Sequence, residues 1–282
     1  MMNTKQKATI LLVLAAIVWG ASFYPMAKTI EISGVFAYLF WRFLLASCVF
    51  ALIFRKDLAQ DRGKSLKAGL ICGLCLAFGF ALQTAALQFT LSSVVAFITG
   101  LYIVMVPFLS YFFYKHKLSL KAIILSLVAL FGMYALSGAK GLSLGLGESL
   151  TAISALAYGL HIVFTSEYVK KCNLGSFVFY QFATLAILYF FIAFFEEKST
   201  FASILNPWVL AFVLVSALVL TNFAFFAQSW SQKHIKASKV ALILALEPIT
   251  AAFVGFYFGE LLSVLQIVGA ALILLAVVMS EN

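Results

Sequence analysis

Long apolar runs set the pattern of this chain. Residues 123–135 and 265–279 are almost entirely apolar and lack the alternation of apolar and polar positions that transmembrane β-strands require. Apolar runs of about 20 residues are long enough to cross a hydrocarbon core of roughly 30 Å as helices. The pattern predicts an all-α polytopic membrane protein with ten transmembrane helices, at about residues 8–27, 34–54, 66–88, 92–114, 119–137, 147–169, 175–195, 206–230, 238–258 and 262–280.

Composition agrees with the apolar runs. The chain is 64% hydrophobic and only 10% charged, whereas a soluble chain carries about 25% charged residues. The connections between the predicted helices are short. The composition therefore excludes a water-soluble domain.

The order of polar and aromatic landmarks repeats along the chain. Five pairs of positions recur at nearly the same spacing: Trp19-Gly20 with Tyr158-Gly159, Arg42-Phe43 with Gln181-Phe182, Gln83 with Gln228, Ser93 with Ser238, and Leu118-Ser119 with Leu262-Ser263. The copies predict a first repeat over residues 1–138 and a second over 145–282. Each copy holds five predicted helices, an odd number, so the second must be inverted in the membrane. Many secondary transporters consist of inverted repeats around one central site.

The net charge of +9 is distributed unevenly across the membrane. Lys28, Lys140 and Lys198 lie on one side, and all other lysines and arginines except Arg42, which is inside a helix, lie on the other. Positive residues are in excess on cytoplasmic loops. We therefore expect an integral protein of the bacterial cytoplasmic (inner) membrane with both termini in the cytoplasm. Because the charge reports topology, we expect no nucleic-acid partner.

Four cysteines raise the question of a metal or redox site. Cys72 and Cys75 form a C-x-x-C pair, which is a weak signal alone. They fall in an apolar helix with no histidine nearby, so packing of small residues explains them better. We expect no metal and no cofactor.

Several segments carry a family resemblance: VWGASF at 18–23, WRF at 41–43, LAYGLH at 156–161, AQSWSQ at 227–232, ALILALEP at 241–248, and Gly259-Glu260. On these segments the chain resembles the EamA-type branch of the drug/metabolite transporter superfamily, over almost its whole length. The resemblance implies two inverted five-helix halves and a cavity lined mainly by helices one, three, four, six, eight and nine. It implies transport of amino acids, nucleotide-related metabolites, sugars or drugs, and some similar members carry S-adenosylmethionine. Members often end the fourth helix with Gly-Glu, where this chain has Lys115-His116.

Glu247 is the foremost candidate for a substrate-binding residue. It lies about ten residues into the predicted ninth helix and directly precedes Pro248, which removes a backbone donor and interrupts a helix. A carboxylate beside a helix break can bind a cationic group or carry a proton, or it can bond freed backbone groups. Pro107 lies in the matching fourth helix. Paired broken helices indicate the central site of a transporter, although each proline also fits a packing kink.

Amides and an arginine form a second group of candidates. Gln83 and Gln228 occupy matching positions in helices three and eight, with Asn222 six residues before the latter. Amides can donate to and accept from a zwitterion, or they can join helices. Arg42 is about 12 Å along the second helix. It can pair with Glu247 or bind a substrate carboxylate. Because the second helix resembles a peripheral one in the family, a structural partner or a snorkelled arginine explains it better.

Aromatic residues and a histidine complete the predicted site. Trp19, Tyr102 and Tyr158 can present aromatic faces to an ammonium or onium group. His161, one turn beyond Tyr158, is either a proton acceptor or a satisfied hydrogen-bonding residue. The chain has 30 phenylalanines, so only aromatic residues near the repeated landmarks stand out.

Together these features predict a secondary transporter that moves a small organic metabolite by alternating access. One buried acid, one arginine and many aromatics favour an amino acid-like, zwitterionic or cationic cargo, S-adenosylmethionine included. The alternatives are a channel or assembly subunit without alternating access and, less favoured, an intramembrane enzyme. No clustered catalytic motif supports an enzyme. The expected partners are a small metabolite and the lipid bilayer, and the sequence leaves monomer and homodimer open.

Overall fold

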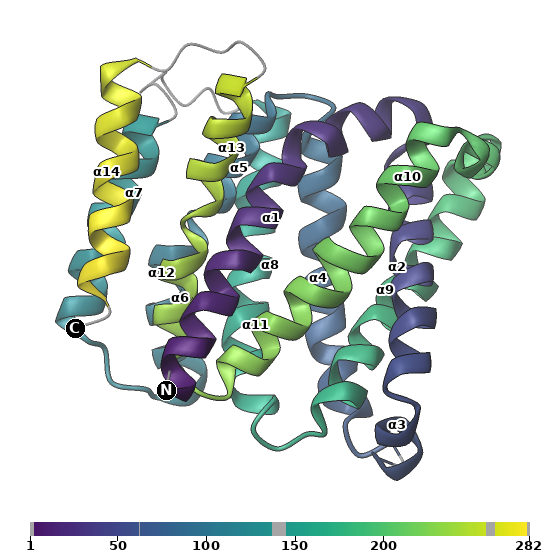
Figure 1. The fold of residues 1–282 in the computed structure, drawn as a ribbon, viewed down its shortest axis with the longest axis horizontal. Coiled ribbons are helices and arrows are strands. Elements are labelled where there is room, and N and C mark those ends of the chain that lie inside the picture. The colour runs from purple at the N-terminus through teal and green to yellow at the C-terminus, as the bar shows by residue number, and fades with distance from the viewer. Residues whose placement is uncertain (1–2, 62, 137–144, 258–262, 281–282) are drawn as a thin grey trace.

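The structure, a computed structural model, describes residues 3–61, 63–136, 145–257 and 263–280. All regular structure in these residues is helical, and Figure 1 shows the helices side by side in one bundle. The first half of the chain forms α1 (Thr4–Ser33), α2 (Val35–Ile53), α3 (Arg55–Asp61), α4 (Leu66–Ala86), α5 (Ser92–Thr99), α6 (Tyr102–Tyr114) and α7 (Leu120–Leu136). The second half forms α8 (Leu146–Tyr168), α9 (Leu174–Glu196), the 3-10 helix η1 (Lys198–Leu205), α10 (Pro207–Val215), the π-helix η2 (Ser216–Phe223), α11 (Ala224–Gln232), α12 (Ala237–Leu244), α13 (Glu247–Tyr257) and α14 (Val264–Met279).

Eight helical stretches of the described chain are long and apolar enough to cross a membrane, judged by length and composition. They match eight of the ten predicted spans. The other two, α7 and α14, are apolar but have only 17 and 16 described residues. The predicted landmarks Lys140, Gly259, Glu260 and Leu262 lie outside the described residues.

The start of α1 and the end of α14 lie at the same end of the bundle (Figure 1). We name this end the basic end, because it also holds α3, which contains Lys56, and the starts of α7 and α12, which follow Lys117 and Lys236 in the sequence. The other end holds the connection from α1 to α2 and η1. The two ends therefore differ in charge in the way the sequence predicts.

The predicted fourth and ninth spans are each broken in the middle. α5 ends at Thr99 and α6 begins at Tyr102, while α12 ends at Leu244 and α13 begins at Glu247. At both breaks the backbone bonds tighten to i→i−3, as in Leu101 N–H to Ile98 O (3.0 Å) and Leu246 N–H to Ile243 O (3.1 Å).

The two prolines relate differently to these breaks. Pro248 has no N–H to donate to the Leu244 carbonyl, so it accounts for the end of α12. Pro107, by contrast, lies inside α6 and away from the first break. That break occurs at Gly100-Leu101, and glycine has a low propensity for helix interiors. Attributing the first break to Pro107 was therefore wrong.

The predicted eighth span is also not a single regular helix. It consists of α10, η2 and α11, with the π-helical turn at Ser216–Phe223 in its centre. Single π-turns within helices occur frequently at functional sites. Here the Leu220 carbonyl accepts a hydrogen bond from Trp19 Nε1 at 2.7 Å.

The most extensive helix packing joins the two halves of the chain. α4 packs on α8 and α9, α2 on α9, α7 on α14, and α1 on α11 and α13. Gly132 of α7 and Gly269 of α14 illustrate the closeness, because a methyl group on Gly132 would lie 2.7 Å from the Gly269 carbonyl oxygen. The halves are therefore interleaved rather than separate bodies.

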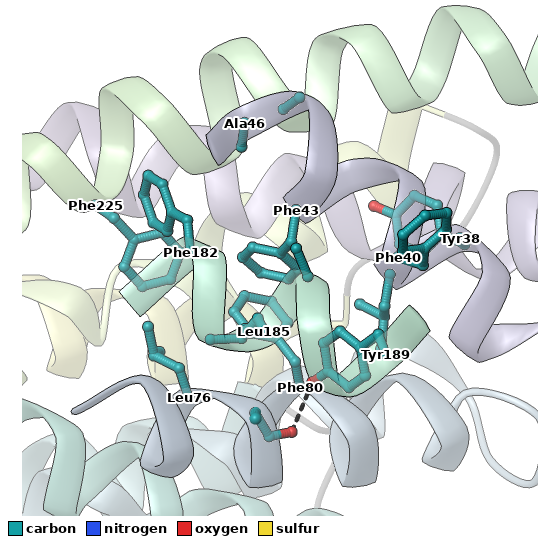
Figure 2. Close-up of a cluster of buried hydrophobic side chains, with 14 of the residues drawn as sticks. Tyr38, Phe40, Phe43, Ala46, Leu76, Phe80, Phe182, Leu185, Tyr189 and Phe225 are labelled. Atoms are coloured by element: carbon teal, nitrogen blue, oxygen red, sulfur yellow. Dashed lines mark hydrogen bonds between the residues drawn. The ribbon is translucent and has the colours of Figure 1, made fainter. Parts of the chain in front are cut away.

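An aromatic cluster fills the space between α2, α4 and α9 (Figure 2). Phe43 of α2 packs on Phe80 of α4, with ring centroids 5.1 Å apart, and on Phe182 of α9, at 6.2 Å. Tyr189 of α9 donates its hydroxyl to the Ala77 carbonyl at 2.6 Å, the dashed line in Figure 2. The cluster fixes α2 against the second half.

A carboxylate joins the halves again at the end opposite the basic end. Glu197 accepts the backbone N–H groups of Val35, Phe36 and Ala37 at 3.0, 2.9 and 2.9 Å. These are first-turn donors of α2, which have no partner within their own helix. A negative charge at a helix N-terminus is favourable. Glu197, from the second half, therefore caps a helix of the first half.

Candidate functional site

A central cavity lies where the two broken helices meet α1, α4, α8 and α11. It encloses about 560 Å³ of space between atoms, including the part open to solvent. Eight of the residues predicted from the sequence line it: Trp19, Arg42, Gln83, Tyr102, Tyr158, His161, Gln228 and Glu247. The lining helices include all six that the family resemblance implies.

Glu247 and Tyr102 meet in this cavity from the two broken helices. Each is the first residue after its break, and the Tyr102 hydroxyl donates to Glu247 Oε1 at 3.2 Å. Both side chains are buried. Tyr102 and Glu247 are separated by the same interval as Gln83 and Gln228, so the contact joins matching positions of the two halves.

The Glu247 carboxylate has no cationic partner among the described residues. No lysine, arginine or histidine nitrogen of these residues lies within 4.0 Å of it. The start of α13 offers partial positive charge, and Tyr102 offers one hydrogen bond. An ionised carboxylate buried without a cation is costly. The site therefore suits a cargo cation or a proton at this position.

A glycine of α1 lies against the break before Glu247, and a glycine of α8 lies near the break before Tyr102, but only the first is in close contact. A methyl group on Gly20 of α1 would overlap the Glu247 carbonyl oxygen and lie 2.7 Å from Thr250 Cβ. On α8, a methyl group on Gly159 would lie 3.7 Å from Tyr102 Cβ. We name these crossings the Glu247 junction (Trp19, Gly20, Glu247) and the Tyr102 junction (Tyr158, Gly159, Tyr102).

Gln83 and Gln228 differ in their hydrogen bonds. Gln83 donates Nε2 to Thr99 Oγ1 at 2.8 Å and accepts the Tyr158 hydroxyl at 2.9 Å, so it joins α4 to α5 and α8. Gln228 lines the cavity, and no hydrogen bond joins its amide to a described residue. The matching amides therefore divide the two roles that the sequence left open, and Gln228 is the one available to cargo.

Arg42 is fully buried between α2 and η2. Its Nε donates to Thr221 Oγ1 at 2.8 Å, and its guanidinium lies 4.8 Å from the centroid of the Phe80 ring. No carboxylate of a described residue lies within 4.0 Å of the guanidinium, so the possible ion pair with Glu247 is not formed. Arg42 reaches the cavity wall, where a cargo carboxylate can approach it.

Trp19 and His161 are held in place by neighbours. The centroids of the Trp19 and Phe225 rings lie 4.8 Å apart, and the Trp19 ring N–H donates a hydrogen bond to the Leu220 carbonyl. His161 Nε2 lies 2.8 Å from Gln181 Oε1 and 3.1 Å from Thr165 Oγ1, a satisfied arrangement. Both rings are oriented before any cargo arrives.

Three predicted residues do not line the central cavity. Asn222 lies in η2, and both polar atoms of its side chain are buried without a hydrogen-bond partner in the described chain. Pro107 lines a second cavity, described below, and Pro248 lines neither. The prolines shape the helices, and they do not form the cavity wall at Glu247.

The cavity has lining residues that were not predicted: Ser22, Phe23, Met26, Phe80, Thr99, Ile162, Phe225 and Leu244. Phe80, Thr99, Ser22 and Phe225 each lie three residues from a predicted residue. Side chains three or four residues apart share a helix face. That spacing was the available signal, and the many other phenylalanines obscured it.

A second, larger cavity opens at the basic end. It encloses about 1720 Å³ by the same measure, and its wall includes Lys117, Lys170 and Lys236. Its inner part reaches Val163 and Leu242, whereas Ile162 and Leu244 line the central cavity. We name it the basic vestibule. These four apolar residues come from α8 and α12, so the same two helices contribute to the walls of both cavities.

Comparisons with known proteins agree over the whole chain. The sequence pattern of the EamA-like transporter family matches residues 6–138 and 145–281. An uncharacterized transporter of Archaeoglobus fulgidus is 32% identical over 268 residues, which are 95% of this chain and 83% of the relative. The uncharacterized transporter YyaM of Bacillus subtilis is 24% identical over 283 residues, 97% of this chain and 93% of the relative. One solved crystal structure is similar to this chain, with a TM-score of 0.77 and 17% sequence identity. The similarity covers 97% of this chain and 95% of the solved one, and it supports the fold only.

Proposed function

This chain is an integral membrane protein that belongs to the EamA-like transporter family, and from that premise we propose that it is a secondary transporter for a small zwitterionic or cationic organic metabolite. Cargo binds in the central cavity and is released by alternating access. Amino acid-like molecules are the favoured class, with S-adenosylmethionine as one candidate. The observation that carries this proposal is the buried Glu247 carboxylate, which has no cationic partner among the described residues.

The lining of the central cavity supports this cargo class. Glu247 provides a negative charge for an ammonium or onium group, and the Trp19 and Phe225 rings provide faces that attract cations. Arg42 and the Gln228 amide provide donors for a carboxylate. A multiply phosphorylated cargo would require several cations here, and Arg42 is the one Lys or Arg among the described residues of the cavity wall.

The two junctions support an inverted-repeat mechanism. In each, a glycine-bearing helix crosses a broken helix at its first residue after the break, Glu247 in one case and Tyr102 in the other. Transporters of this kind expose one central site alternately through movement of one repeat against the other. On this proposal, residues 1–138 and 145–282 are the two repeats.

The basic vestibule supports a direction for one opening. α8 and α12 line both cavities, with Val163 and Leu242 in the vestibule wall and Ile162 and Leu244 in the wall of the central cavity. Basic residues accumulate on the cytoplasmic side of membrane proteins. We propose that the basic end faces the cytoplasm of a bacterial inner membrane, that both termini lie there, and that these four apolar residues form the cytoplasmic gate.

The test has two stages in purified protein. Thermal unfolding is first measured with amino acids, nucleosides and S-adenosylmethionine, because a ligand that binds the native state raises its Tm. The molecule that raises Tm is then used in counterflow with proteoliposomes. Trans-stimulation is expected of a carrier, whereas a channel or an assembly subunit shows none.

Glu247→Gln separates the assigned site from the rest of the protein. The substitution keeps the size and one acceptor of the side chain and removes its charge, so we expect uptake to fall at least about ten-fold with the protein still folded in the membrane. The control is Glu31→Gln, which removes a 62% exposed carboxylate that pairs with Lys28. Such exposed pairs contribute about 0–1 kcal/mol. Uptake by Glu247→Gln at the control's rate would refute the assignment.

A further inference from the structure

The basic vestibule gathers lysines from three separate connections into one recess. Lys117 and Lys121 come from the start of α7, Lys170 follows α8, and Lys236 and Lys239 come from the start of α12. Among the described residues, Glu167 is the one acidic residue in the wall of this cavity. The described part of the recess therefore has an excess of positive charge.

Glu167 is already occupied by two neighbours. Its Oε1 lies 2.9 Å from Lys170 Nζ and 3.6 Å from His116 Nε2. No carboxylate of a described residue lies within 4.0 Å of Lys117, Lys121 or Lys236. Like charges that face a shared recess repel one another and concentrate anions there.

The positive-inside rule does not account for this convergence. The rule requires basic residues at the cytoplasmic end but does not require them to face one cavity. Lys56, Lys64 and Lys67, around α3 and the start of α4, are at the same end of the bundle and line neither cavity. Figure 1 shows α3 on the opposite side of this end from α6, α7 and α12.

Hydroxyl and backbone donors accompany the lysines. Ser119 and Ser238 line the vestibule. The cap residue of α12 is Lys236, whose side chain cannot accept a hydrogen bond, so no side chain caps the first N–H groups of this helix. These donors add to a site that the lysines define.

We propose that the basic vestibule is a binding site for a phosphate group, separate from the central cavity. A phosphate offers several acceptor oxygens and up to two negative charges, so it can engage lysines from more than one connection at once. A monocarboxylate would neutralise a single lysine. The phosphate belongs either to a soluble organic phosphate or to an anionic lipid headgroup, which present the same chemistry to the protein.

The test compares two triple variants in two settings. Lys117→Gln/Lys121→Gln/Lys236→Gln removes the unpaired vestibule charges, and Lys56→Gln/Lys64→Gln/Lys67→Gln removes as many charges from the same end. In neutral detergent, Tm is followed against sodium phosphate, with sodium chloride at equal ionic strength as reference. In vesicles, Tm is compared between pure phosphatidylcholine and phosphatidylcholine with phosphatidylglycerol.

We expect phosphate, phosphatidylglycerol or both to raise the Tm of the wild type and of the control variant with Lys56, Lys64 and Lys67 substituted. In the vestibule variant the half-saturating concentration rises at least about ten-fold, or the Tm shift disappears. A response to phosphate alone identifies a soluble ligand, and one to phosphatidylglycerol alone identifies a lipid. Equal responses of the two triple variants, or no response of the wild type, would overturn the proposal.

Three further variants keep the result decisive. If the triple vestibule variant does not fold, Lys236→Gln is titrated in its place, with Lys56→Gln as control. Glu247→Gln is included because its charge lies in the other cavity. Its phosphate response should equal that of the wild type, so failure of the vestibule site and failure of the proposed transport site can be told apart.

Discussion

The break between α5 and α6 and the break between α12 and α13 have the same backbone form but present different side chains. Tyr102 follows the first break and Glu247 the second, and the two meet at 3.2 Å. Around the Tyr102 junction, the Gln83 amide is hydrogen-bonded to both the Thr99 and the Tyr158 hydroxyl. At the Glu247 junction the carboxylate has one protein partner, and Gln228 has none among the described residues.

The difference teaches that two breaks of the same backbone form have different roles. The Tyr102 junction satisfies its own polar groups, which stabilises the packing of α4, α5 and α8. The Glu247 junction leaves a charge and an amide available at the cavity. Buried polar groups that lack partners are costly, so their presence on one side indicates where the cargo contributes the missing interactions.

The largest expected effect comes from adding a methyl group to Gly20, and the same change at Gly159 is the comparison. Gly20→Ala forces α1 away from α13, because the new Cβ would overlap the Glu247 carbonyl oxygen. Overpacking of this kind costs about 1–3 kcal/mol, and we expect transport to fall to background. At Gly159 the nearest atom is the flexible Leu109 Cδ1, at 3.1 Å. Gly159→Ala should stay within about 0.5 kcal/mol, and equal Tm losses would contradict the asymmetry.

A second pair of substitutions separates stabilisation from binding. Gln83→Leu leaves the Tyr158 and Thr99 hydroxyls without their partner and should lower the free energy of unfolding by about 1–3 kcal/mol. Gln228→Leu removes no hydrogen bond to a described residue. It should leave Tm unchanged and weaken cargo binding about ten-fold, equivalent to about 1.4 kcal/mol. Thermal unfolding and ligand titration of both variants test this, and the reverse pattern would show that the roles were assigned to the wrong amides.

The smallest effect is expected at the contact between the junctions. Tyr102→Phe removes one hydrogen bond to Glu247 and keeps the ring. Hydrogen bonds within membrane proteins contribute about 0.6 kcal/mol on average, so counterflow should change only two- to three-fold, roughly. Loss as complete as that of Glu247→Gln would mean that the tyrosine hydroxyl itself takes part in binding or proton transfer.

Much of this arrangement could be predicted from the sequence because helix-long apolar runs and repeated landmarks leave a clear signal. Eight of the ten predicted spans are helices long enough to cross a membrane. Glu247, Gln83 and Gln228 line the central cavity, as their positions in the predicted spans indicated. The break at Gly100-Leu101 could not, since no proline marks it and only the packing of Met133 against Gly100 distinguishes the site. The π-turn at η2 likewise has no local signal in the sequence. Its Leu220 carbonyl accepts hydrogen bonds from Trp19 and Arg42, which come from two other helices.

Arg42 shows the limit of reasoning from burial alone. Its depth along α2 indicated that it is buried and favoured a structural partner or snorkelling over an ion pair with Glu247. In the structure a threonine hydroxyl and an aromatic ring are among its partners, and the sequence named neither. The partner of a membrane arginine depends on which neighbouring helix faces it, and spacing along one helix does not contain that information.

The interleaving of the halves has a consequence for how the protein is made. α2, α4 and α7 bury their main faces on α9, α8 and α14, and α2 obtains its N-terminal cap from Glu197. During synthesis, the earlier half enters the bilayer before any of these surfaces exists. Its helices have only their smaller contacts with one another until the later half is made, so a product that ends between the halves leaves the main packing faces of α2, α4 and α7 uncovered.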